Sequence, residues 1–255
     1  MQAPAPILAR PWNPPRPMND LPLNGPPAAT TASPPALPSL RLVDVACRRG
    51  ERVLFTGLDE TLAPGEMLWL RGGNGRGKTS LLRLVAGLAA PERGQILWGD
   101  APTRRNADFA ARLVYIAHAN ALKDDLTGAE SLAFLARIHA RDADAPALRA
   151  ALARLGLAGR ERTPTRALSQ GLRRRVALAR LALETRAALW VLDEPFDALD
   201  VAGTATLHAL LATHRARGGS VLLTSHHLHL DEQAARAGFR VLDLDTLPRD
   251  AGALP

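Results

Sequence analysis

The chain has 255 residues, of which 47% are hydrophobic, and a formal net charge of +7. This length can bury a substantial core, and no apolar run approaches the roughly 18 residues needed to cross a bilayer, so we expect a globular protein that does not span a membrane itself. The single cysteine, Cys47, excludes an internal disulfide and fits a reducing compartment. The low aromatic content of 4% argues against base-stacking platforms, so nucleic acid is not expected as a partner.

The composition of the sequence changes near Leu40. Residues 1–39 hold 12 of the 20 prolines and have no periodicity, which predicts a disordered tail. From Leu40 onward, alternating apolar residues predict strands over 40–49 and 53–72, the second interrupted by a turn at Pro64 and Gly65. Helical spacing then predicts a helix over 77–88.

The second half alternates helices with short buried strands. Apolar residues at helical spacing fill about 122–159, and a further helix follows Ser169. The remaining expected elements are a buried strand at 188–195, a helix at 201–217, and strands at 220–225 and 240–245. Because strands alternate with helices, we expect an α/β fold with a parallel sheet, and a helical block at about 120–180 inserted beside it.

A glycine-rich loop lies between a predicted strand and a predicted helix. It reads GGNGRGKT and fits the pattern G-x-x-x-x-G-K-[ST] in the context expected of a phosphate-binding loop. Glycines let backbone N–H groups converge on phosphate oxygens, Lys78 reaches the β and γ phosphates, and the Thr79 hydroxyl ligates Mg²⁺. The expected nucleotide-binding residues are Gly72, Gly73, Asn74, Gly75, Arg76, Gly77, Lys78, Thr79 and Ser80.

Two carboxylates end the buried strand LWVLDEP. Parallel α/β sheets bind ligands at the carboxyl ends of their strands, so Asp193 and Glu194 are expected beside the phosphate loop. Asp193 would hold Mg²⁺, and Glu194 would polarise the water that attacks the γ-phosphate.

Between these two motifs, ALSQGLRRRVALARL resembles the signature segment of ABC transporter ATP-binding subunits. Leu168, Ser169 and Gly171 match the usual L-S-G-G-Q pattern, whereas Gln170 and Leu172 depart from it. FDALD, which ends at Asp200, resembles the family's D-loop, and LLTSHH places His226 as its switch histidine. These likenesses extend over about residues 40–245.

The resemblance implies a P-loop NTPase of the ABC type, with a RecA-like parallel core, an antiparallel β subdomain and an inserted α-helical subdomain. We place the ATP-binding domain at 40–247. ATP would lie between two copies of the chain, with Ser169, Gln170 and Gly171 of one copy capping the nucleotide held by the other. The aromatic residue that usually stacks on adenine is missing, which leaves Phe55 or an arginine plane, Arg48 or Arg49, for that contact.

The strand-like run YIAH, which begins at Tyr115, ends at His118, where most family members have glutamine. With CRRGERVLF, GKTSLLRL and LS-x-G-x-RRRVALARL, it resembles the branch of the family that serves c-type cytochrome biogenesis by heme export or heme-chaperone release. This implies an ATPase at the cytoplasmic face of the bacterial inner membrane, bound to a membrane-spanning permease subunit. An ABC subunit for another small cargo, a soluble ABC ATPase acting on nucleic acid and a non-hydrolysing nucleotide-binding module are the alternatives.

Three interpretations of His118 are open on the sequence alone. It could bind a metal ion, pack at the strand end without a catalytic part, or act in place of the glutamine amide near Mg²⁺ and the attacking water. In the third interpretation His118 is catalytic together with Glu194 and His226.

Overall fold

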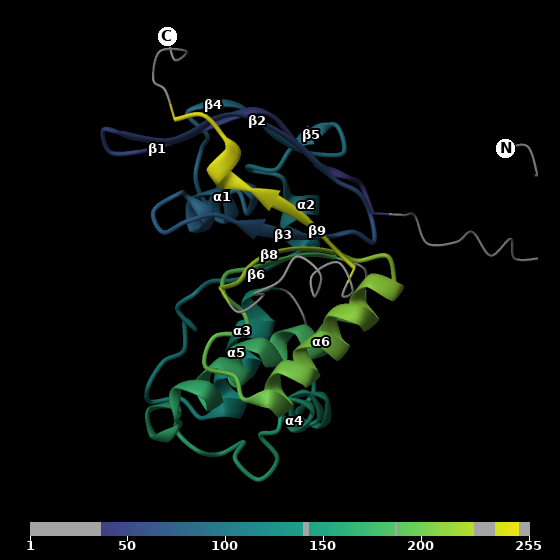
Figure 1. Cartoon of the computed structure of the whole chain (residues 1–255). Coiled ribbons are helices and arrows are strands. Elements are labelled where there is room, and N and C mark those ends of the chain that lie inside the picture. The colour runs from purple at the N-terminus through teal and green to yellow at the C-terminus, as the bar shows by residue number, and fades with distance from the viewer. Residues whose placement is uncertain (1–36, 140–142, 187, 227–237, 250–255) are drawn as a thin grey trace, which may run out of the picture. The chain divides into compact units, whose positions relative to one another are not determined.

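The computed structural model describes residues 37–139, 143–186, 188–226 and 238–249. The tail predicted at 1–39 lies outside these ranges except for its last three residues. The chain divides after Pro35, and all the described residues belong to the second part. Figure 1 shows the chain, with most elements of this part labelled.

An antiparallel sheet is formed by the first strands of the domain. Its strands run in the order β2-β1-β4-β5. Buried apolar residues of β1 and β2, among them Leu40, Leu42 and Leu58, pack in one core beneath this sheet. The strands are β1 (Leu40–Arg49), β2 (Arg52–Leu62), β4 (Arg93–Trp98) and β5 (Ala101–Pro102).

A parallel sheet forms the centre of the domain, with strand order β6-β7-β8-β3-β9. Every pairing in it is parallel, from Leu113 beside Leu189 at one edge to Arg71 beside Asp243 at the other. The strands are β3 (Met67–Arg71), β6 (Leu113–Ile116), β7 (Leu189–Leu192), β8 (Ser220–Thr224) and β9 (Phe239–Asp243).

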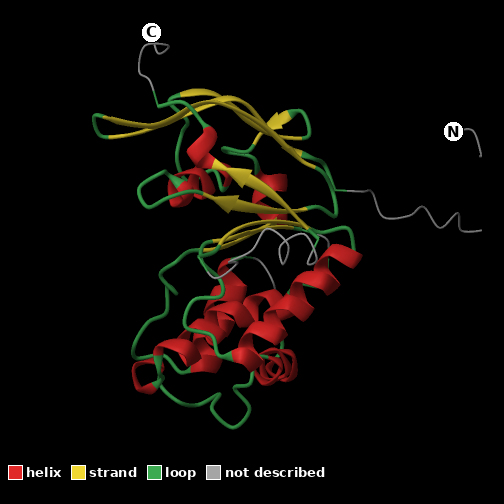
Figure 2. Ribbon diagram, viewed as in Figure 1, coloured by secondary structure: helices red, strands yellow, loops and turns green. Residues whose placement is uncertain are grey.

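Each face of the parallel sheet belongs to a separate apolar core. On β7, Leu189 and Val191 pack with the antiparallel sheet and α1, while Trp190 and Leu192 pack with the helices on the opposite face. Strands buried on both faces are expected to be apolar throughout, and all four β7 residues are buried. Figure 2 shows the resulting layers: antiparallel sheet, parallel sheet and helical layer in succession.

Six α-helices complete the described residues, and most begin at a side-chain cap. Thr127 and Glu130 form a reciprocal capping box at α3, and Asp144, Ser169 and Asp200 cap α4, α5 and α6. The helices are α1 (Lys78–Val85), α2 (Ala107–Arg112), α3 (Gly128–Ile138), α4 (Ala145–Arg154), α5 (Gln170–Leu183) and α6 (Val201–Ala216); short 3-10 turns are η1 (Thr165–Ala167) and η2 (Leu244–Thr246).

The α/β class with a parallel core, an antiparallel sheet and a helical block is confirmed. Helices α3, α4 and α5 lie in the stretch where the helical block was expected. Helix α2 was not anticipated, because one turn and a half carries too few apolar residues to show a period; its single buried side chain is Phe109. Within the described ranges, none of the helices is both long and apolar enough to cross a membrane.

Candidate active site

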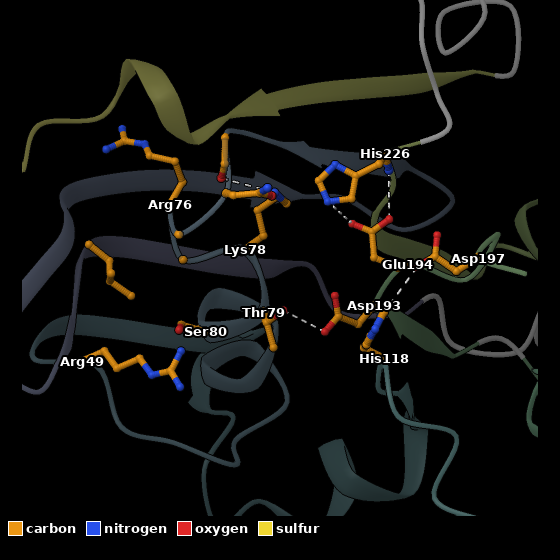
Figure 3. A pocket seen from close by; sticks show the side chains of 15 residues that line it. Arg49, Arg76, Lys78, Thr79, Ser80, His118, Asp193, Glu194, Asp197 and His226 are labelled. Atoms are coloured by element: carbon orange, nitrogen blue, oxygen red, sulfur yellow. Dashed lines mark hydrogen bonds and ion pairs between the residues drawn. The ribbon is translucent and has the colours of Figure 1, made fainter.

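A pocket of about 340 Å³ lies at the carboxyl ends of β3, β7 and β8, where parallel sheets bind their ligands. Figure 3 shows its side chains, with Lys78, Glu194 and His226 close together. It gathers residues that are far apart in the sequence: Arg49, Leu54, the loop residues 73–80, His118, Asp193, Glu194, Asp197 and His226. All the expected nucleotide-binding residues line it except Gly72.

The phosphate loop is shaped by close packing at its last glycine. Gly77 has φ 98°, and a Cβ there would lie 3.1 to 3.2 Å from side-chain atoms of Leu54 and Phe55. Only glycine tolerates both conditions, so the loop can turn directly into the N-terminus of α1. The ammonium of Lys78 lies over the loop, 2.7 Å from the carbonyl of Gly72.

The side chain of Arg76 is directed away from Lys78 and Glu194 (Figure 3). It is only 3% exposed and donates a 3.0 Å hydrogen bond to the carbonyl of Leu247, with a second bond to the carbonyl of Leu244. The carboxylate of Asp245 pairs with the same guanidinium and accepts a 2.9 Å bond from the backbone N–H of Gly73. Arg76 therefore ties the phosphate loop to the segment after β9.

The acidic pair is buried and held by hydroxyl groups. Asp193 and Glu194 are 2% and 6% exposed. The Thr79 hydroxyl donates to Asp193 Oδ2 at 2.9 Å, and the Thr224 hydroxyl donates to Asp193 Oδ1 at 2.9 Å while accepting from the N–H of Glu194 at 2.9 Å. Glu194 has φ 48°, a left-handed conformation that costs energy in a non-glycine residue. Thr224, the last residue of β8, therefore holds the turn that orients Glu194.

Arg174 of α5 lies beneath the same turn. Its guanidinium is 3% exposed and donates to the carbonyls of Asp193 at 2.7 Å and Glu194 at 2.8 Å. It also donates to the carbonyl of Ala117 and to Asn120 Oδ1, each at 3.0 Å. Burial lowers the pKa of Arg174, and the neighbouring carboxylates, with Asp197 first among them, oppose this.

His226 and His118 approach the acidic pair from different loops. The backbone N–H of His226 donates to Glu194 Oε2 at 2.9 Å, and its Nε2 lies 3.3 Å from Glu194 Oε1. His118 Nδ1 lies 3.7 Å from Asp197 Oδ2 across the pocket. The His118 side chain is 67% exposed, so it does not pack at the strand end within the described chain, and its catalytic part stays a prediction. Across the described residues, no group of three or more His, Cys, Asp or Glu side chains is placed to share a metal ion.

The signature residues and Asp200 do not line this pocket. Ser169 accepts a hydrogen bond from the N–H of Leu172 at 3.3 Å and caps α5. Asp200 accepts from the N–H of Gly203 at 2.7 Å and caps α6, and this bond lowers its pKa. The chain therefore keeps Ser169, Gln170, Gly171 and Asp200 apart from its own phosphate loop.

Phe55 cannot stack on a base, because it is fully buried beneath the phosphate loop. Arg49 and Leu54 line the pocket instead, which leaves a guanidinium plane and an aliphatic side chain for that contact. Arg48 is paired with Glu92 at 3.2 Å.

Sequence reasoning assigned no role to Thr224, Arg174 or Asp197. Thr224 and Asp197 stand within two segments that carry the family resemblance, LLTSHH and FDALD, so their positions were marked but their contacts were not. Arg174 is one of three consecutive arginines, and the sequence does not tell which of them faces the acidic turn.

A phosphate loop at a parallel sheet, acidic residues on the neighbouring strand and a separate signature helix define a P-loop ATP-binding protein. A family model described as ABC transporter matches residues 55–197. Together with relatives of about 50% identity, this match shows that the chain belongs to the ABC transporter family.

Two relatives of the chain carry the same description. "Cytochrome c biogenesis ATP-binding export protein CcmA" of Aromatoleum aromaticum is 50% identical over 74% of this chain and 89% of its own length. A protein with the same description from Albidiferax ferrireducens is 47% identical over 74% and 90%. The resemblance seen in the sequence motifs is thereby confirmed.

Solved structures share the fold. An ABC transporter ATP-binding protein from Pyrococcus furiosus has a TM-score of 0.68 at 19% identity, over 82% of this chain and 98% of its own. A dimeric ATP-binding cassette in a post-hydrolysis state, bound to ADP and phosphate, has a TM-score of 0.68 at 22% identity, over 80% and 93%.

Proposed function

We propose that the chain is the ATP-hydrolysing, energy-coupling subunit of an ABC transporter complex for c-type cytochrome biogenesis, acting in heme export or heme-chaperone release. The observation that carries this proposal is the 50% identity to a CcmA protein over 89% of that protein's length. Many cargoes occur in the broad family, so family membership alone does not indicate a cargo. Identity and coverage this high support a shared role as well.

In this proposal the phosphates of ATP bind along the phosphate loop. Backbone N–H groups at the start of α1 and the ammonium of Lys78 supply positive potential, and Lys78 moves from the Gly72 carbonyl to the β and γ phosphates when they arrive. The base lies toward Arg49 and Leu54.

The oxygens of Thr79 and Asp193 suit Mg²⁺. They are 2.9 Å apart, and adjacent ligands of an octahedral ion with bonds of about 2.1 Å lie about 3 Å apart. Bound there, the ion would neutralise charge on the β and γ phosphates. Thr79 and Asp193 would hold it, and the second oxygen of Asp193 stays fixed by Thr224.

Glu194 is proposed as the group that polarises the attacking water. Its carboxylate accepts the water proton as the new P–O bond forms and the bond between the γ-phosphorus and the bridging oxygen of ADP breaks. His226 contacts the same carboxylate and would donate a hydrogen bond to the γ-phosphate. His118 is proposed to orient the water in place of the family's glutamine, since its exposed ring faces the pocket.

A second copy of the chain completes the site. Ser169, Gln170 and Gly171 lie at the N-terminus of α5, where backbone N–H groups and a hydroxyl suit a phosphate group of the partner's ATP. Because they are held apart from the phosphate loop of their own chain, they are available to another copy. Asp200 would lie near the same interface as part of the D-loop.

A membrane-spanning partner, CcmB-like, is proposed to dock beside the loop after β6. An apolar pocket of about 400 Å³ lies there, lined on one side by residues 117 and 119–121 next to His118. Leu88, 66% exposed, also lines it. An apolar helix of the partner would cover these side chains and hold the chain at the cytoplasmic face of the bacterial inner membrane as a peripheral subunit.

Complementation tests the proposal. Cells that lack their own CcmA should regain c-type cytochromes, measured by heme staining, when they express this chain with its membrane partner. Expression of the Glu194→Gln variant should not restore them. If the wild-type chain is made, hydrolyses ATP and restores no cytochrome, it serves another small cargo instead.

A further inference from the structure

Three consecutive arginines of α5, Arg173 to Arg175, contact three different parts of the domain. Successive residues of a helix point about 100° apart, so one run can serve three surfaces. Arg173 donates to the carbonyl of Thr165 at 2.7 Å, within the helical block. Arg175 donates to the carbonyl of Leu155 at 2.9 Å and pairs with Asp200. Arg174 alone of the three reaches the acidic turn.

The contacts of Arg174 join two loops that carry proposed catalytic groups. Its Nη2 binds the carbonyls of Asp193 and Glu194, and its Nη1 binds the carbonyl of Ala117 and the side chain of Asn120. A planar guanidinium can hold several acceptors in fixed directions at once, which an ammonium cannot. The turn that aims Glu194 and the loop that carries His118 therefore share one buried cation.

The same helix begins at the signature segment. Ser169 caps α5, and Arg174 follows five residues later, a rise of about 8 Å along a rigid helix. The first turn also contacts the segment after Glu194: a Cβ on Gly171 would lie 2.5 Å from the carbonyl of Ala198. The helix start and the turn are therefore joined by direct contacts.

We propose that Arg174 is the positioning residue through which a nucleotide capped by this chain's signature segment controls the Glu194 turn of this chain's own site. The inference rests on the proposed function, since it requires a second copy whose ATP contacts Ser169. When that ATP binds, α5 is drawn to it, and Arg174 carries the displacement to the carbonyls of Asp193 and Glu194. Occupancy of one site then prepares the other.

Steady-state hydrolysis by the full-length chain provides the first test. The wild type should hydrolyse ATP with a Hill coefficient above 1. Arg174→Gln should bring the Hill coefficient to 1 and lower kcat at least tenfold, while the affinity for a fluorescent ATP analogue changes less than twofold. Arg174→Lys keeps the positive charge but lacks the planar guanidinium, so it should show the same losses as Arg174→Gln. Arg173→Gln, with contacts only in the helical block, should keep wild-type cooperativity.

Mixed dimers give the sharper test. One subunit carries Glu194→Gln, so that only the other hydrolyses ATP. Arg174→Gln on the hydrolysing chain should reduce the rate at least tenfold, whereas the same change on the Glu194→Gln chain should reduce it less than threefold. Equal effects on both chains, wild-type cooperativity in both Arg174 variants, or a Hill coefficient of 1 in the wild type would overturn the inference. Failure of Glu194→Gln to form an ATP-dependent dimer would instead contradict the proposed function.

Discussion

Replacement of Thr224 by valine removes one buried hydroxyl from the acidic turn and keeps the shape of the side chain. This hydroxyl donates to Asp193 Oδ1 and accepts from the N–H of Glu194, both at 2.9 Å. Thr224 is fully buried, so no solvent can replace the hydroxyl. The substitution therefore leaves a carboxylate oxygen and a backbone donor without this partner.

The expected loss of stability follows from these two groups. Each buried polar group left unpaired costs about 1–3 kcal/mol, so Thr224→Val, which leaves two, should lower the free energy of unfolding by about 2–6 kcal/mol. With a urea slope of about 2.5 kcal/mol per molar, the midpoint should fall by about 1–2 M. We also expect kcat to fall at least tenfold, because the turn that orients Glu194 loses its hydrogen bond to Thr224.

Urea titration followed by tryptophan fluorescence measures the stability, and phosphate release measures the activity. Thr213→Val is the matched control, because the Thr213 hydroxyl donates to the carbonyl of Ala209 on the exposed face of α6. This control should change stability by less than about 0.5 kcal/mol. The reasoning fails if Thr224→Val unfolds at the same urea concentration as Thr213→Val and hydrolyses ATP at the wild-type rate.

Three further substitutions test other parts of the structure. Burial lowers the pKa of His214 from 6.5 to about 4, so below pH 6.5 the unfolded chain binds a proton that the folded chain does not. The free energy of unfolding should therefore fall by about 3 kcal/mol between pH 6.5 and 4, and urea titrations of His214→Gln should lack this loss. Gly171→Ala places a Cβ 2.5 Å from the carbonyl of Ala198, and should reduce ATP hydrolysis at least tenfold while nucleotide binding, measured by fluorescence, persists. Arg49→Ala should raise KM for ATP about fivefold with kcat unchanged, from the loss of a contact of about 1 kcal/mol; an unchanged KM would remove Arg49 from the base site.

Local motifs were enough to anticipate the parts of the site that depend on neighbouring residues. The phosphate loop turns into α1 because glycines and a helix start stand together in the sequence. Asp193 and Glu194 meet that loop because both follow strands of one parallel sheet, and the carboxyl ends of such strands share an edge. The short apolar runs at 188–195 and 220–225 likewise predicted buried strands, and every residue of β7 and β8 is buried.

Long-range contacts could not be anticipated in the same way. Arg76 stands within the phosphate loop, yet its side chain binds the carbonyl of Leu244 in η2, 168 residues later in the chain. Arg174 faces the acidic turn only because of the rotation of α5, which packing decides. His118 was left with three interpretations, since the exposure of a side chain depends on the tertiary fold; its ring is exposed in the described chain, and its part in catalysis stays a prediction.

The mass of the Glu194→Gln variant in solution tests the central claim most directly, which is that two copies of the chain enclose ATP and hydrolyse it. The chain has a mass of 27.2 kDa. With Mg²⁺ and ATP, light scattering should give twice that mass, and ADP should leave the monomer; phosphate release should be nearly abolished. A variant that binds ATP yet stays monomeric, or that still turns over at a substantial rate, would contradict the account.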